Sequence, residues 1–159
     1  MTKPPKFIEA ISAPTRKGSR YPAPYDEPCR ARTKYILGEM FGLDQFGVNL
    51  VTLEPGAWSS QRHWHENEDE FIYVFSGEIT LADESGEHLL MPGMCAGFKA
   101  GNPNGHCLKN LTDKPVQYLE VGTRAKVEKG YYSDIDMMFV EDGKSEKFLH
   151  KDGTSFRKL

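Results

Sequence analysis

The sequence has no long apolar run and almost no net charge, and each shortage excludes a class of protein. Even its longest apolar runs are short, such as Phe71 to Phe75, whereas a membrane-spanning helix needs about 20 apolar residues. Residues 1–12 lack an apolar segment followed by a small-residue cleavage site, so no secretion signal is predicted. With 20 basic and 23 acidic residues, the chain has no basic excess of the kind that binds nucleic acid. We therefore expect neither a membrane nor a nucleic acid as partner.

Cysteine is also scarce. Cys29, Cys95 and Cys107 are an odd number and lack the C-x-x-C spacing of metal sites. We interpret them as free thiols and predict a cytoplasmic protein. The 159 residues are about one domain's length and suffice for one hydrophobic core.

No segment keeps a 3.6-residue apolar period, so long amphipathic helices are not predicted. The chain instead carries short apolar runs separated by Gly, Pro, Asn and Asp. The runs are Tyr35–Leu37, Val48–Leu53, Phe71–Phe75, Ile79–Ala82, Leu89–Met91 and Val116–Val121. Many short strands at close spacing predict an all-β sandwich or barrel.

The two ends of the chain differ from this central part. Six of the ten prolines lie in residues 1–32, which predicts an extended N-terminal arm across the barrel or onto a second subunit. A disordered tail is the alternative. Residues 33–125 would form the barrel, and residues 126–159 a C-terminal extension packing on it. Within the extension, Tyr131 to Phe139 fits a short strand or a helical turn, and Asp152–Gly153 predicts a hairpin turn.

Three histidines and one glutamate are the candidate functional residues of the sequence. His63 and His65 are two apart, so on a strand both imidazoles project from one face while Trp64 points away. Glu70 begins an apolar run, where a carboxylate is costly unless a cation compensates its charge. His106 follows a turn signal and also begins an apolar run. Together these residues predict a site for one divalent metal ion.

Plainer interpretations remain for each residue. Glu70 could belong to a solvated acidic turn, because four acids lie in residues 66–70. A single histidine after a turn, as His106 would be, is more often structural than a ligand. His88 and His150 do not lie in a pattern with other candidate ligands, and we interpret them as ordinary surface or hydrogen-bonded histidines.

The spacing Gly56–x6–His63–Trp64–His65–x4–Glu70–x6–Gly77 resembles the first motif of the cupin superfamily. Gly93 through Gly101, followed by Gly105, His106 and x3–Asn110, resembles the second motif. That second stretch departs from the pattern, because Lys99 replaces the usual proline and the gap from Gly101 to the histidine is longer by two. The run Arg62 to Phe75, together with Ala96–Phe98 and Tyr118–Gly122, resembles a group of small single-domain bacterial cupins.

The resemblance implies a double-stranded β-helix, the cupin jelly roll, with its ligands pointing into a cavity. It carries over His63, His65, Glu70 and His106 as the metal ligands, Gly56, Gly77 and Gly93 as turn residues, and Asn110 as a structural residue. Four such ligands leave two open positions on octahedral Fe, Mn or Ni, whereas four-coordinate Zn would be closed. The sequence does not choose among these metals.

Two function classes remain open. The chain could be an enzyme, an isomerase or an oxygenase, acting on a small oxygen-bearing molecule such as a diketone, hydroxy acid, phenol or sugar. It could instead be a non-catalytic module that stores or senses a small molecule. A third interpretation is a metal-free cavity in which the histidines are polar lining. Arg62, Tyr118 and Glu120 are candidate substrate or supporting groups near the cavity, although we favour a barrel-wall or surface role for each.

Two further expectations concern surfaces. Ile72, Val74 and Leu108 share strand parity with the ligands, which predicts a mainly apolar cavity. Phe71, Tyr73 and Phe75 alternate with the inward residues and therefore face outward. Three exposed aromatics are typical of an interface, so we predict a homodimer.

Overall fold

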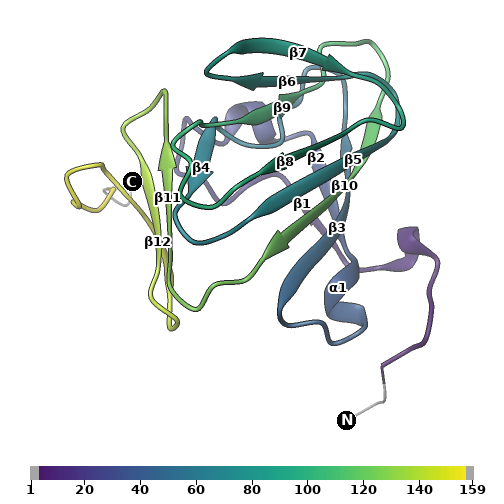
Figure 1. The fold of residues 1–159 in the computed structure, drawn as a ribbon, viewed down its shortest axis with the longest axis horizontal. Helices are drawn as coiled ribbons and strands as arrows, with labels where there is room; N and C mark the ends of the chain where they lie inside the picture. Colours follow the sequence, from purple (N-terminus) through teal and green to yellow (C-terminus); the bar gives the residue numbers. More distant parts are fainter. Residues whose placement is uncertain (1–3, 157–159) are drawn as a thin grey trace.

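Short β-strands are the main regular elements of the computed structural model, which describes residues 4–156 (Figure 1). The strands are β1 (Thr15–Lys17), β2 (Arg32–Ile36), β3 (Phe46–Leu53), β4 (His63–His65), β5 (Glu70–Ser76), β6 (Ile79–Asp83), β7 (Gly86–Leu90), β8 (Cys95–Phe98), β9 (Cys107–Lys109), β10 (Val116–Thr123), β11 (Glu128–Tyr132), β12 (Met138–Glu141) and β13 (Glu146–Leu149). The helical elements are one turn each: α1 (Leu37–Met40) and two 3-10 turns, Ala10–Ser12 and Glu27–Cys29. Within the described residues, no helix has the length and apolar character needed to cross a bilayer.

The strands form three antiparallel sheets that enclose one interior. The largest has the order β1-β2-β3-β10-β5-β8, and two smaller sheets have the orders β7-β6-β9 and β13-β12-β11-β4. Figure 1 shows β6, β7 and β9 above the large sheet and β11 and β12 standing beside it. This is the all-β, double-stranded β-helix that the sequence predicted.

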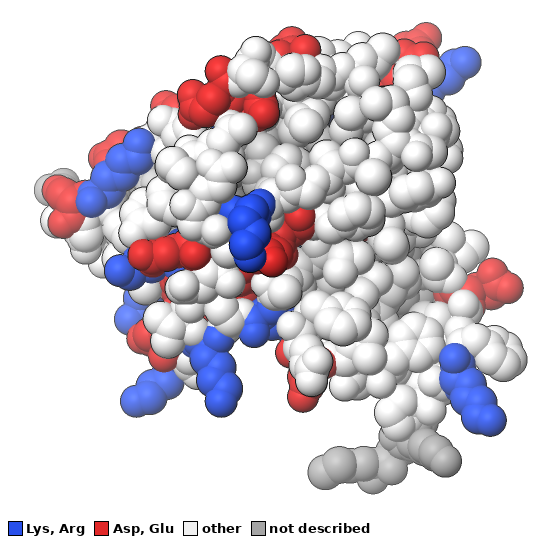
Figure 2. Space-filling model, viewed as in Figure 1, with Lys and Arg blue, Asp and Glu red and all other residues white. Residues whose placement is uncertain are grey.

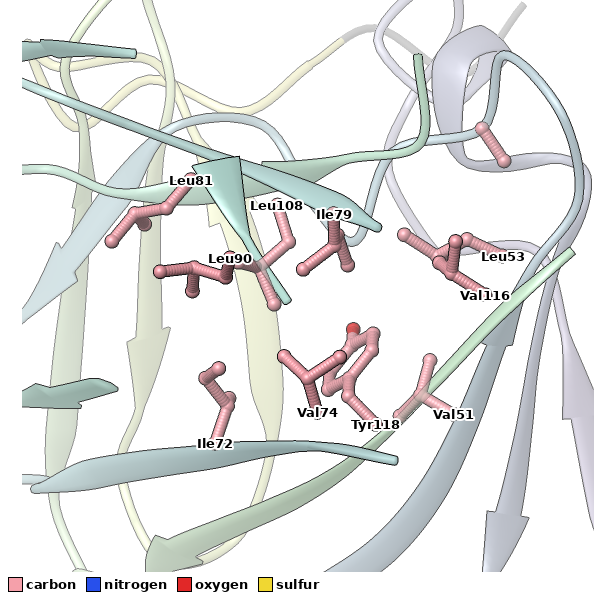
Figure 3. Close-up of a cluster of buried hydrophobic side chains, with 11 residues drawn as sticks. Val51, Leu53, Ile72, Val74, Ile79, Leu81, Leu90, Leu108, Val116 and Tyr118 are labelled. Carbon is pink, nitrogen blue, oxygen red and sulfur yellow. The ribbon is translucent and has the colours of Figure 1, made fainter. Parts of the chain in front are cut away.

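The core lies between the sheets because inward and outward residues alternate along each strand. On β5, Ile72 and Val74 are buried while Phe71, Tyr73 and Phe75 are exposed. Leu53, Ile79 and Leu108 meet the β5 residues from other strands in one apolar cluster (Figure 3). In the view of Figure 2 the surface over β5 carries no charged side chain, whereas charges gather near β11 and β12.

A glycine sets the tight turn between β5 and β6. Gly77 has φ +76, and a Cβ at this position would approach the Val116 side chain to 2.7 Å. Only glycine adopts this backbone conformation without cost and leaves room for Val116. The prediction of a turn glycine here is confirmed.

Two local expectations were wrong. Leu37 begins α1 instead of ending a strand. Tyr131 to Phe139 is neither one strand nor a helical turn, because Tyr132 ends β11 and Met138 begins β12. Ser133, Asp134 and Asp136 interrupt this stretch and lie in the bend between the two strands. The turn at Asp152–Gly153 is confirmed, because Leu149 bridges to Ser155 across it.

Segments from both ends of the chain meet beside the barrel. β1 is the edge strand of the large sheet and pairs with β2. The Tyr21 ring packs edge-on against Tyr132 and Phe148, with ring centroids 5.4 and 5.3 Å apart. β11 in turn pairs with β4, the strand that carries the two neighbouring histidines. The division of the chain at residues 32 and 125 stays a prediction.

Candidate metal centre

Strand alternation on β4 brings two imidazoles to one side. The Nε2 atoms of His63 and His65 lie 3.1 Å apart. Trp64 between them points away and stacks on Tyr131, with ring centroids 4.5 Å apart. The arrangement on β4 is the one that the spacing predicted.

Glu70 and His106 reach the same point from two other segments. His106 pairs with His63 through two backbone hydrogen bonds of 2.8 and 3.1 Å. The Oε2 atom of Glu70, at the start of β5, lies 2.9 Å from Nε2 of His106. The same oxygen is 3.6 Å from His65 Nε2 and 3.9 Å from His63 Nε2. The ligand atoms of His63, Glu70 and His106 therefore form one group in which all lie within 4.8 Å of one another. His65 lies outside that group and reaches it through His63 and Glu70.

The donor set at this point suits a cation. Nδ1 of His63 lies 2.9 Å from the backbone carbonyl of Gln61, which can only accept, so Nδ1 carries the proton and Nε2 presents a lone pair. Nδ1 of His65 faces the Glu128 carboxylate at 3.5 Å, which favours the same tautomer. Two imidazole lone pairs 3.1 Å apart, beside a carboxylate, repel one another unless a positive charge lies between them. The residues therefore fit a divalent metal ion.

Electrostatics favours the protonation states that a metal needs. Burial, together with the neighbouring His65, lowers the pKa of His63 to about 3, so this ring is neutral at physiological pH. Burial alone would raise the pKa of Glu70. The hydrogen bond from His106 and the nearby imidazoles instead hold that pKa well below its usual range. Glu70 is thus an anion and His63 a neutral donor.

His65 differs because it faces a second carboxylate. Burial opposes its protonation, but Glu128 and the charge of Glu70 together raise the pKa of His65. A proton on His65 would therefore compete with a metal ion at the same nitrogen.

Sequence reasoning missed Glu128. This first residue of β11 is fully buried, and its carboxylate accepts backbone N–H groups from Glu66 and Asn67 at 2.8 and 2.9 Å. Glu68, His65 and Glu128 also form a second group whose ligand atoms lie within 4.8 Å of one another. Since both Glu128 oxygens already accept hydrogen bonds, we interpret Glu128 as a support that orients His65. Its polar neighbours in the sequence gave no signal, because the contact depends on β11 pairing with β4.

The ligands open into a cavity of about 330 Å³. Ile72, Leu108 and Phe98 line part of it, but the prediction of a mainly apolar wall was wrong. Charged side chains from both ends of the chain and from its central part also line it: Arg16, Arg20, Arg32, Lys34, Glu68, Glu120, Glu141 and Glu146. The parity argument failed because it counted only apolar residues, whereas Lys34 pairs with Val51 and Glu120 with Ile72 on the same inward face.

The three candidate supporting residues separate into two groups. Tyr118 and Glu120 line the cavity from β10. Arg62 lies outside the cavity wall, where it forms ion pairs with Glu84 and Asp134 at 2.9 and 2.6 Å. Its assignment to the cavity was therefore wrong.

The remaining predicted residues are structural. Asn110 is fully buried and donates to the carbonyls of Leu53 and Lys114 at 2.9 and 2.8 Å. His88 contacts Ser85 and Asp83 on the surface, and His150 contacts Asp136.

Comparison with known proteins points to one family. A family model described as "Cupin domain" matches residues 49–122. A crystal structure of a sugar phosphate isomerase from a cupin superfamily, from Silicibacter pomeroyi, is 47% identical, with a TM-score of 0.91. The match covers 95% of this chain and 96% of that one.

More distant matches agree on the fold. A protein from Acidithiobacillus ferrooxidans, named as a proposed sugar phosphate isomerase, is 25% identical over 80% of this chain and 81% of that one, with a TM-score of 0.72. The oxalate decarboxylase of Bacillus subtilis (strain 168) is 29% identical over 96 residues, which are 55% of this chain. The chain spans only 22% of the length of that relative.

Proposed function

This chain belongs to the cupin superfamily, and on that basis we propose that it is a metal-dependent isomerase acting on a small polyhydroxylated carbonyl compound, a sugar phosphate. One observation carries the proposal: three imidazoles and one carboxylate converge at the wall of a cavity of about 330 Å³, a size that suits a small organic ligand. The named activity of the Silicibacter pomeroyi protein supports the substrate class.

His63, His65, Glu70 and His106 would hold one divalent ion. When bound, such an ion supplies Lewis-acid polarisation of a carbonyl or hydroxyl oxygen. The donor set suits Fe, Mn, Ni or Zn alike. Phe98 stacks on the His106 ring, with centroids 3.5 Å apart, and so fixes the plane of that donor.

Isomerisation of an aldose to a ketose also needs a group that moves a proton between adjacent carbons. We assign this role to Glu120, whose Oε1 accepts from Lys34 at 2.6 Å and from Asn49 at 3.0 Å. These two contacts occupy one carboxylate oxygen, Oε1, and Glu120 lines the cavity. Glu120 pairs in register with Ile72, two residues from Glu70, so the carboxylate lies diagonal to the metal ligands.

The test is elemental analysis of the purified protein, followed by NMR of phosphorylated aldoses in D₂O. We expect interconversion with the ketose and deuterium incorporation at the carbon that receives the proton. Glu120→Gln should abolish both while the metal content stays unchanged. If the metal-loaded protein binds sugar phosphates without converting any, the chain is the non-catalytic binding module instead.

We also propose a homodimer formed through the outer face of β5. Phe71, Tyr73 and Phe75 are 41%, 37% and 52% exposed, and Met91 and Met94 add further exposed apolar surface. A patch of this kind is larger than isolated surface residues explain and suits a second copy. Light scattering at micromolar concentration should give twice the chain mass. A mass of 18.0 kDa at every concentration would contradict the dimer.

We also propose that the protein is cytoplasmic. All three cysteines are free, with Cys29 and Cys107 buried and Cys95 exposed. Free thiols suit a reducing compartment. Retention of unmodified thiols in protein isolated from its own cells, measured by mass spectrometry, tests this assignment.

A further inference from the structure

One row of residues crosses the large sheet from its edge to its centre. The strand register pairs Arg16 with Lys34, Lys34 with Val51, and Val51 with Tyr118. Directly paired residues project from the same face of a sheet. Because Val51 and Tyr118 face the core, Arg16 and Lys34 project from the same face of the sheet, and both line the cavity. Arg16 does so from the exposed edge strand β1.

This part of the wall, which we name the basic end of the cavity, contains four cationic side chains: Arg16, Arg20, Arg32 and Lys34. Three of them already have partners. Arg32 donates to the carbonyls of Gly18 and Ser59, and Arg20 forms an ion pair with Glu146. The ammonium group of Lys34 donates one hydrogen bond to Glu120 and has two further N–H donors for a ligand.

Arg16 stands apart from these three. Among the described residues, its guanidinium has neither an ion pair nor a hydrogen bond. No acid of the described chain neutralises Arg32 either, since it donates only to carbonyls. Arg16 and Arg32 therefore bring positive charge that no ion pair of the described residues neutralises to a cavity wall that Glu68 and Glu141 also line, and such local charge attracts an anion.

A second observation points to a polar ligand in the same cavity. The Tyr118 side chain is 1% exposed, yet its hydroxyl has no hydrogen-bond partner within residues 4–156. Buried hydroxyls are almost always paired, because an unpaired one loses its hydration without compensation. Tyr118 lines the cavity, and Figure 3 shows its oxygen pointing inward from β10. A ligand oxygen would satisfy it.

We propose that the basic end binds the phosphate group of the ligand, with Arg16 and Lys34 as its charged partners. Tyr118 then donates to a ligand oxygen between the phosphate and the metal ligands. The guanidinium fork of Arg16 matches two phosphate oxygens at once, and Lys34 adds a point charge. This inference rests on the proposed function and adds that β1, an element outside the residues of the cupin motifs, completes the substrate site.

The test compares ligands that differ only in their anionic group. Isothermal titration calorimetry of the purified protein measures binding of glucose 6-phosphate, glucose and glucuronate. We expect glucose 6-phosphate to bind at least about tenfold more tightly than the other two. Equal binding of glucuronate and glucose 6-phosphate would overturn the assignment to phosphate.

Matched variants then locate the phosphate. Arg16→Ala should remove most of the tenfold preference, and Arg16→Lys should keep part of it. Lys17→Ala is the control, because it removes the same charge one residue away, on the opposite face of β1. Tyr118→Phe removes only the hydroxyl and should weaken binding of glucose 6-phosphate and glucose alike. If Arg16→Ala and Lys17→Ala bind glucose 6-phosphate equally well, the basic end is not the phosphate site.

Measurements of metal content and isomerisation in Arg16→Ala distinguish a failure of the phosphate site from a failure of the proposed isomerase activity. Elemental analysis of Arg16→Ala should match the unaltered protein, because Arg16 is remote from the ligands in the sheet. An Arg16-dependent preference for glucose 6-phosphate without isomerisation would support the basic end and contradict the isomerase. Isomerisation that Arg16→Ala leaves unchanged would support the isomerase and contradict the basic end.

Discussion

The metal-ligand end of the cavity and its basic end are assembled over different distances along the chain. His63, His65 and Glu70 lie within eight residues of one another, and His106 joins them through backbone pairing with His63. At the basic end, Arg16, Lys34 and Tyr118 come from three strands spread over most of the chain. Local spacing therefore defines one end, and long-range strand register defines the other.

Removing a metal ligand is the sharpest way to separate the two ends. His63→Ala should weaken metal binding by more than about 100-fold, the upper range for loss of a mere supporting residue. Elemental analysis after dialysis measures this loss, and the glucose 6-phosphate preference set by Arg16 should survive. His88→Ala, a surface histidine on β7, is the matched control. Equal metal retention by both variants would contradict the assigned ligands.

Glu128→Gln tests the support behind His65. The change keeps the size of the side chain but removes the charge and one acceptor, so the backbone N–H of Glu66 or Asn67 loses its partner. Metal affinity should fall roughly 10- to 100-fold, as expected when the residue orienting a ligand is lost. Glu66→Gln is the control, because its side chain is exposed beside Lys129. Competition with a chelating dye measures both affinities.

The pH dependence of metal affinity follows from the contrast between His63 and His65. His63, with a pKa of about 3, does not compete for protons near neutrality. The pKa of His65 is raised, so its proton must leave before the metal binds. Affinity should therefore fall about tenfold per pH unit once the pH drops below the His65 pKa. A flat profile between pH 5 and pH 8 would show that His65 holds no proton in the metal-free protein.

The smallest effect is expected where the N-terminal segment meets the C-terminal sheet. Arg20 pairs with Glu146, but the Arg20 side chain is 58% exposed. A double-mutant cycle with Arg20→Ala and Glu146→Ala should give a coupling free energy of about 0–1 kcal/mol, because solvent screens such pairs. Urea unfolding measures it. A much larger coupling would mean that this ion pair closes the basic end.

The contrast between the two ends also explains what the sequence could predict. Strand alternation placed His63 and His65 on one face and Ile72 and Val74 in the core, because those rules act over a few residues. No such rule links Glu128 to His65, or Arg16 to Lys34. Those contacts arise from pairing between strands far apart in the sequence, and polar residues near the chain ends resemble ordinary surface. The apolar cavity was mispredicted for the same reason.

The position of Trp64 gives the protein an intrinsic optical reporter. This indole lies on β4 between two of the candidate ligands and stacks on Tyr131, whereas the second tryptophan, Trp58, packs under Lys109. Unpaired d-electrons quench indole emission at close range, and a filled d-shell does not. In a Trp58→Phe background, the emission of Trp64 would thus distinguish Fe, Mn or Ni from Zn without removing the ion from its site.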